Sequence, residues 1–236
     1  MIGKRFRVSP KPAKTLLWIW VKKDLASMKG KIGVDLASGS MLNKPFFVTK
    51  NYIAVDVNKV KLDEGLVKYP DATVFNTTIN DYLNNPKNES PDVLVCLQTM
   101  GTNQFFEHDE TFSTIENMYR ALRPGGGMIV NIGDFGVDLI DMERRLSELL
   151  HSKFASVRLR AYGAFDYGGL QPRWEQVDGK FARRVGGAQR PKQTPIHALL
   201  ARFALPIALL MHLVPPLRTG FGMRKSRLYY CCTGKI

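Results

Sequence analysis

The chain has 236 residues, 44% of them hydrophobic, which is enough for one domain of ordinary size with a buried core. Its formal net charge of +13 is concentrated at the two ends. Residues 1–31 hold nine Lys+Arg against one acid and residues 161–236 hold twelve against three, whereas the middle of the chain is slightly acidic. The three cysteines, two of them adjacent, offer neither the spacing of a metal site nor that of a disulfide framework.

The elements expected along the chain alternate between strands and helices. A helix over residues 14–28 follows a basic, proline-containing start. Strands are predicted at 31–38, 51–58, 72–76, 91–98, 127–133, 155–162 and 227–234, and further helices at 111–122 and 137–151. This alternation predicts an α/β fold with a seven-stranded, mostly parallel sheet and helices on both faces.

The interval of residues 163–225 interrupts this rhythm and is interpreted as an insertion before the last strand. We expect a single domain over residues 1–236, with a basic N-terminal helix region at 1–30 and this basic and apolar insertion. The apolar stretch at 196–217 is broken by His197, Arg202, Pro206 and His212, so it is not expected to span a membrane.

A ligand pocket is expected where the first predicted strand ends, in the sequence GVDLASGS at residues 33–40. Small residues at a strand end let the backbone approach a ligand closely, and the N–H groups of such a turn can donate to it. In an open α/β sheet, ligands bind beyond the carboxyl ends of the strands. Asp56 ends the second strand, 17 residues after Gly39, where a carboxylate can accept both hydroxyls of a ribose.

On these residues the chain resembles the class I S-adenosylmethionine-dependent methyltransferases, which have a Rossmann-like fold. The sequence from Asp35 to Met41 stands at the place of the family's first motif and retains one of its glycines, Gly39. The sequence LRPGGG at residues 122–127 matches the family's turn before the fifth strand, and this match is the most specific one. The G-x-G-x-x-G of a nicotinamide-binding domain is absent from the sequence.

The resemblance implies S-adenosylmethionine as the cofactor and a set of residues that bind it. Asp56 stands at the place of the ribose acid, Thr78 and Ile79 fall near the adenine position, and Gln98 and Thr99 follow the fourth strand at the amino-acid end. The residues expected to bind the cofactor are Asp35, Ala37, Ser38, Gly39, Asp56, Val57, Thr78, Ile79, Gln98 and Thr99. No metal-ligand cluster is visible in the sequence.

Two residues are candidates for a catalytic base, which methyl transfer needs only when the acceptor must lose a proton. His108 follows the fourth strand and resembles a histidine that many small-molecule members of the family carry, and Asp134 follows the fifth strand. The alternatives are a surface or helix-start position for His108 and a turn or helix cap for Asp134. Since no motif of an amino-group methyltransferase is visible, we expect O-methylation of a hydroxyl on a glycan, a lipid-linked molecule or another small molecule.

The basic ends of the chain indicate an anionic partner. Basic residues beside a broken apolar stretch are typical of a helix in a membrane interface, and Trp18 and Trp20 share this amphipathic character. A lid over the pocket or a homodimer contact is the alternative. We expect the protein in the cytoplasm, at the inner face of a membrane if the first interpretation holds.

Two other functions stay open at this stage. A nucleic-acid methyltransferase, acting for instance on RNA, would also use the positive ends, although no RNA-binding module is recognisable. A non-catalytic partner protein that keeps the methyltransferase fold is the other, because the first motif has lost two glycines.

Overall fold

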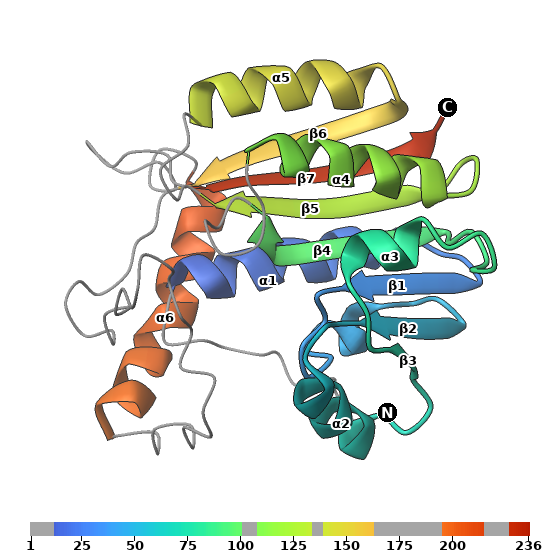
Figure 1. Cartoon of the computed structure of the whole chain (residues 1–236). Helices are drawn as coiled ribbons and strands as arrows, with labels where there is room; N and C mark the ends of the chain where they lie inside the picture. Colours follow the sequence, from blue (N-terminus) through green and yellow to red (C-terminus); the bar gives the residue numbers. More distant parts are fainter. Residues whose placement is uncertain (1–11, 101–107, 134–138, 163–194, 215–226) are drawn as a thin grey trace, which may run out of the picture. The chain divides into compact units, whose positions relative to one another are not determined.

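A computed structural model (Figure 1) describes residues 12–100, 108–133, 139–162, 195–214 and 227–236. By their internal contacts these residues fall into two compact units. The sheet unit comprises residues 21–160 and 227–236, and the helical unit comprises residues 1–20 and 161–226.

The elements follow one another as strands and helices in alternation. The strands are β1 (Ile32–Leu36), β2 (Asn51–Val55), β3 (Thr73–Phe75), β4 (Val93–Met100), β5 (Gly127–Gly133), β6 (Phe154–Tyr162) and β7 (Arg227–Lys235). The helices are α1 (Pro12–Leu25), the 3₁₀ helix η1 (Lys44–Phe46), α2 (Lys59–Lys68), α3 (Ile79–Leu83), α4 (His108–Ala121), α5 (Leu139–His151) and α6 (Pro195–Leu213).

The seven strands form one sheet in the order β3-β2-β1-β4-β5-β7-β6. The pairs β1–β2, β1–β4, β2–β3 and β4–β5 are parallel, and β7 runs antiparallel to β5. Because parallel crossovers are right-handed, α2, on the way from β2 out to β3, and α3, on the way back to β4, lie on opposite faces. The expected seven-stranded, mostly parallel α/β sheet is confirmed.

The central strands are covered on both faces, as the continuous apolar centre of β4 predicts. Every residue of β1 and β5 is buried, and in β4 only Gln98 is exposed. The core of the sheet unit therefore runs along β1, β4 and β5, and their carboxyl ends are held in fixed positions.

Two helices of the sheet unit were absent from the sequence-based assignment. Helix α2 is capped by Asn58, whose side chain accepts from the N–H of Lys61, and α3 is capped by Thr78, whose side chain accepts from the N–H of Asp81. Both caps satisfy donors that a helix start leaves unpaired. In α2 the apolar residues Val60 and Val67 are exposed, and α3 has only five residues, so neither helix gives a clear 3.6-residue period.

A buried ionic cluster within the sheet unit ties the last residues of α1, from Val21 on, to the antiparallel end of the sheet. The carboxylate of Asp24, 1% exposed, lies 2.8 Å from Arg158 and 2.6 Å from Arg160, and it accepts from the hydroxyl of Tyr229 at 2.8 Å. A buried carboxylate needs such partners, because desolvation alone would expel it. The cluster fixes the end of α1 against β6 and β7.

In the helical unit, Trp20 joins segments that are far apart in sequence. Its indole N–H donates to His212 of α6 at 3.0 Å, and its ring meets Tyr162 edge-on with centroids 5.1 Å apart. Trp20 and Trp18 are both buried. The expectation that these two tryptophans present an amphipathic surface is therefore wrong, since a buried ring cannot meet a membrane.

No helix in the described part of the chain combines the length and the apolar character needed to cross a bilayer.

Candidate functional site

The candidate site lies at the carboxyl ends of β1, β2, β3 and β4. The chain leaves β1 toward β2 on one side and later returns to β4 on the other, so the direction of the connections reverses between β1 and β4. The register pairs Leu36 with Val55 and with Cys96, and Val55 with Phe75. The residues that follow these four strand ends therefore share one edge of the sheet, the usual place for a ligand in this architecture.

The loop after β1 follows a path that glycine normally supplies. Ala37, Gly39 and Met41 all have positive φ, at 52°, 52° and 57°. The loop is held by backbone hydrogen bonds from Ser38 N to Val55 O and from Met41 N to Ser38 O, both 3.0 Å long. Two L-residues with a Cβ thus adopt the left-handed conformation, which costs about 1–2 kcal/mol each.

The side chain of Met41 is accommodated by a glycine on the neighbouring helix. Met41 is fully buried, and a Cβ built on Gly65 of α2 would lie 2.8 Å from its Cγ. The space that a side chain at residue 65 would need is thus filled by Met41. Helix α2 therefore packs closely against a larger residue at position 41, and the glycine that allows this stands in α2.

Asp56 connects the loop to the end of β2. One carboxylate oxygen accepts from the N–H of Gly39 at 2.7 Å and the other from the N–H of Asn58 at 2.8 Å. The amide of Asn76, just after β3, donates to the main-chain oxygen of Asp56 at 3.0 Å. Each carboxylate oxygen has a second acceptor position, so two hydroxyl donors can still be accommodated. Asp56, at the position expected to bind a ribose, is thus hydrogen-bonded directly to Gly39 of the loop.

Beside Gly39 there is room for a ligand. A Cβ built on Gly39 meets no heavy atom within 4 Å. The hydroxyl oxygen of its neighbour Ser38 is buried and has no hydrogen-bond partner among the described residues. Buried polar atoms are almost always paired, so this hydroxyl indicates a partner other than the described residues.

Asp35 lies beneath this loop and is enclosed by protein partners. It accepts from the hydroxyl of Tyr52 at 2.8 Å and from the amide of Asn43 at 3.1 and 3.3 Å. Burial raises the pKa of Asp35 to about 7, against the lowering effect of these two hydrogen bonds. The same burial, together with the charge of Asp35, raises the pKa of the Tyr52 hydroxyl.

The residues expected near an adenine lie at the ends of β2 and β3. Val57, directly after Asp56, is 61% exposed and offers an apolar surface at the site edge. Thr78 is exposed and Ile79 is buried. The hydroxyl of Thr78 donates to the carboxylate of Asp81 at 2.6 Å while capping α3, so its hydrogen bonds serve the helix start.

The residues expected at the amino-acid end of the cofactor lie in an irregular part of β4. The pairing of β4 with β5 shifts between Cys96 and Met100, and Gln98 has a φ of 60° and is exposed. Thr99 is buried, and its hydroxyl donates to Leu97 O at 3.2 Å. A bulge of this kind turns one side chain out of the strand, here that of Gln98.

The side chains of the two candidate bases lie outside the part of the chain that the structure describes. His108 is the first residue of α4, but its side chain lies outside the described residues, as does Asp134 entirely. Both stay predictions. Within the described residues no group of three or more His, Cys, Asp or Glu is arranged to hold a metal ion.

The turn at residues 122–127 lies at the opposite edge of the sheet. Gly125 has a φ of 77°, and a Cβ on Gly126 would lie 2.9 Å from the main-chain oxygens of Arg123 and Asp92. Arg123 pairs with the carboxylate of Asp92, which also accepts from the N–H of Ile32. The most specific sequence match is therefore a structural turn at the amino ends of β1 and β5, and it does not line the site.

Sequence reasoning missed the residues that support the site. Tyr52 and Asn43 around Asp35, and Gly65 against Met41, come from other elements and follow no motif. One signal was available for Gly65, because a glycine inside a helix is unfavourable and often marks a close approach.

No family profile and no curated protein matches the sequence. Solved structures do match it. The N-methyltransferase NodS from Bradyrhizobium japonicum WM9 is 11% identical, with 95% of this chain and 94% of that chain covered at a TM-score of 0.51. An rRNA methylase from Streptococcus thermophilus is 18% identical, with 61% and 86% covered at a TM-score of 0.48.

A third match is the magnesium protoporphyrin IX methyltransferase from Synechocystis PCC 6803, 14% identical, with 65% and 73% covered at a TM-score of 0.48. At these identities the likeness concerns the fold, and the alignment with NodS extends over nearly the whole of both chains. Together with the strand order and the loop after β1, it shows that this chain has the class I S-adenosylmethionine-dependent methyltransferase fold.

Proposed function

We propose that the protein is an S-adenosylmethionine-dependent methyltransferase that acts on a glycan, a lipid-linked molecule or another small molecule. The observation that carries the proposal is the joint between two strand ends. The loop with its three left-handed residues is bonded through Gly39 N–H to the carboxylate of Asp56, 2.7 Å away, at the edge where this architecture binds ligands.

The residues at this edge fit the cofactor. Asp56 keeps acceptor positions for the two ribose hydroxyls. The buried hydroxyl of Ser38, which has no partner among the described residues, offers a polar contact. The space beside Gly39 lets the backbone approach the bound molecule, and exposed Val57 suits one face of an adenine ring. The proposal also keeps the predicted contacts with the adenine and the amino-acid end of the cofactor, which are those of Val57, Thr78, Ile79, Gln98 and Thr99.

The bound cofactor supplies an electrophilic methyl group on a sulfonium. The protein's part is to hold the acceptor in line and to exclude water, because positive charge disperses as the methyl group moves. For a hydroxyl acceptor a base must also take a proton, and we assign this role to His108 or Asp134.

The acceptor class is supported by charge and by the second unit. The acidic middle of the chain does not suit a phosphate track, whereas residues 161–236 are basic and contain the apolar α6. We therefore place the protein in the cytoplasm, at the inner face of a membrane, with an acceptor that is itself anionic or lipid-linked. The name of NodS gives nitrogen as the acceptor atom in that protein; for this chain we propose oxygen.

Calorimetric titration with S-adenosylmethionine tests the proposal. We expect binding to the unmodified protein and at least a tenfold weaker affinity for Asp56→Asn, which keeps the shape of the side chain and removes its charge. Asp63→Asn is the matched control, because Asp63 is an exposed acid on α2 that pairs only with Lys59 in the described residues. Thermal unfolding of both variants shows that the fold is intact.

The other two functions predict different results. A folded protein that does not bind S-adenosylmethionine would be a non-catalytic partner with this fold, and the proposal would fail. A nucleic-acid methyltransferase would retain RNA on the unmodified protein in a salt-sensitive way and transfer labelled methyl groups to it. We expect transfer to hydroxyl-bearing small molecules or lipid extracts and none to RNA.

A further inference from the structure

We propose that the exposed apolar face of α6 docks the protein onto an anionic lipid surface. The inference extends the membrane location proposed above and does not depend on methyl transfer. It stands on three observations: the distribution of burial around α6, its lack of acidic residues, and the charge of the sequence on either side of it.

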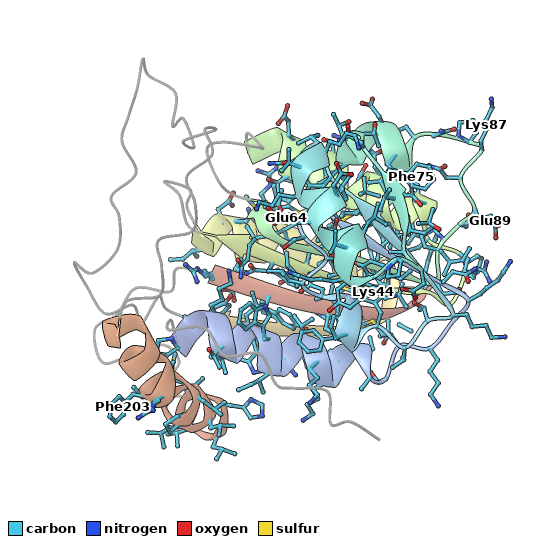
Figure 2. The ribbon with its side chains drawn as sticks, turned by 90° about the horizontal axis from the view of Figure 1, so that it is seen from below. Lys44, Glu64, Phe75, Lys87, Glu89 and Phe203 are labelled. Atoms are coloured by element: carbon cyan, nitrogen blue, oxygen red, sulfur yellow. The ribbon has the colours of Figure 1, made fainter. Side chains whose placement is uncertain are left out.

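One face of α6 is apolar and exposed. Phe203, Leu210 and Leu213 are 54%, 52% and 74% exposed, and Leu209 and Val214 are exposed as well. Figure 2 shows Phe203 pointing away from the helix. The spacings of seven and three residues between Phe203, Leu210 and Leu213 place them on one side of an α-helix. These residues make a continuous apolar face, which we call the docking face.

The opposite face of α6 is the one that packs. Ala204, Ala208 and Met211 are buried, and their spacing of four and three residues places them on the other side of the helix. The hydrogen bond between Trp20 and His212 fixes the end of the helix within the helical unit. The helix is therefore held by one side, and its docking face is not needed for that packing.

The charge of the sequence on either side of α6 favours an anionic surface as the partner of the docking face. From residue 179 to residue 226 the sequence contains nine Lys+Arg and no Asp or Glu. Arg202, at the edge of the docking face, is exposed and is the sole charged residue of α6. An apolar helix face with cations on both sides of it in the sequence is the combination that binds at an anionic membrane surface, with the apolar side chains below the head groups.

Other occupants fit less well. A contact with a second copy of this chain would bring two strongly basic segments together without acids to pair them. A transmembrane position is excluded for α6, because no described helix meets the length and hydropathy required. An anionic lipid surface satisfies both the apolar face and the cations.

Sedimentation with vesicles tests the inference on the full chain. We expect co-sedimentation with vesicles that contain phosphatidylglycerol, at least tenfold weaker binding to pure phosphatidylcholine, and weaker binding at 0.5 M salt. Replacing Leu210 and Leu213 together by Gln should lower binding at least tenfold. Ile140→Gln is the matched control, because Ile140 is 79% exposed on α5 and should change nothing.

Several results would overturn the inference. These are no binding of the unmodified protein to anionic vesicles, equal binding of the double variant, or an equal loss in Ile140→Gln. A dimer in solution that the double variant loses, without any vesicle binding, would assign the docking face to a contact between copies. Calorimetry with S-adenosylmethionine on the same variants reports on methyl-donor binding separately, so the two proposals fail independently.

Discussion

The buried carboxyl of Asp35 predicts an unusual dependence of stability on pH. Its folded pKa of about 7 lies above the ordinary value of 3.8, because burial disfavours the charged form. At pH values between these two pKa values, the native state therefore holds a proton that the unfolded chain has already released. Stability from this group is fully present below pH 4, falls as the pH rises from 4 to 7, and stays at its lower level above pH 7.

The size of the effect follows from the two pKa values. One pKa unit corresponds to about 1.4 kcal/mol, so the full loss across the window is about 4 kcal/mol, of which about 2.5 kcal/mol falls between pH 5 and pH 8. Asp35→Asn cannot ionise and can still accept from Tyr52. The free energy of unfolding of this variant, relative to the unmodified protein, should rise by about 2.5 kcal/mol over the same interval.

Urea unfolding followed by circular dichroism at pH 5 and pH 8 measures this difference. Other carboxylates titrate equally in both proteins and cancel in the comparison. Asp63→Asn serves as the control, because Asp63 is exposed and should give the same difference at both pH values. A difference for Asp35→Asn that does not change between pH 5 and pH 8 would refute the assignment of a raised pKa.

Two further changes test the packing of the sheet unit, each by urea unfolding. Asp24→Ala leaves Arg160, which is 11% exposed, without its carboxylate and should lower the free energy of unfolding by about 3–5 kcal/mol. Glu116→Ala, in an exposed pair with Arg120, should lower it by under about 1 kcal/mol, and equal losses would contradict the buried cluster. Gly65→Ala should destabilise the protein by about 1–2 kcal/mol despite the better helix propensity of Ala, since its Cβ meets Met41. Combining it with Met41→Ala should cost at least about 1 kcal/mol less than the sum of the two single changes. A stabilising Gly65→Ala would disprove this contact.

Much of the fold could be predicted from the sequence because its strongest signal is local. Buried strands such as β1, β4 and β5 are mostly apolar, and that pattern can be recognised without knowledge of their neighbours in the fold. Helices α2 and α3 were missed because they are held by caps and by packing. The burial of Trp18 and Trp20 could not be predicted either, since an amphipathic pattern does not say which partner covers it.

The site was predictable in its outline and not in its details. Gly39 and Asp56 were identified from their places at two strand ends, and the structure joins them by one hydrogen bond. The partners of Asp35 were not, because Asn43 and Tyr52 reach it through the tertiary fold. The glycine turn at residues 122–127 shows the opposite case: a clear motif whose residues serve strand placement.

The loop after β1 has the backbone conformation of a glycine-rich loop without the glycines that usually produce it. Its three alternating residues keep positive φ values of 52° to 57°, although only one of them is glycine. Such a loop can thus form without its usual glycines, provided that each side chain finds room, as Met41 does beside Gly65. In this chain, therefore, torsion angles at the first strand end identify the loop where its residue types do not.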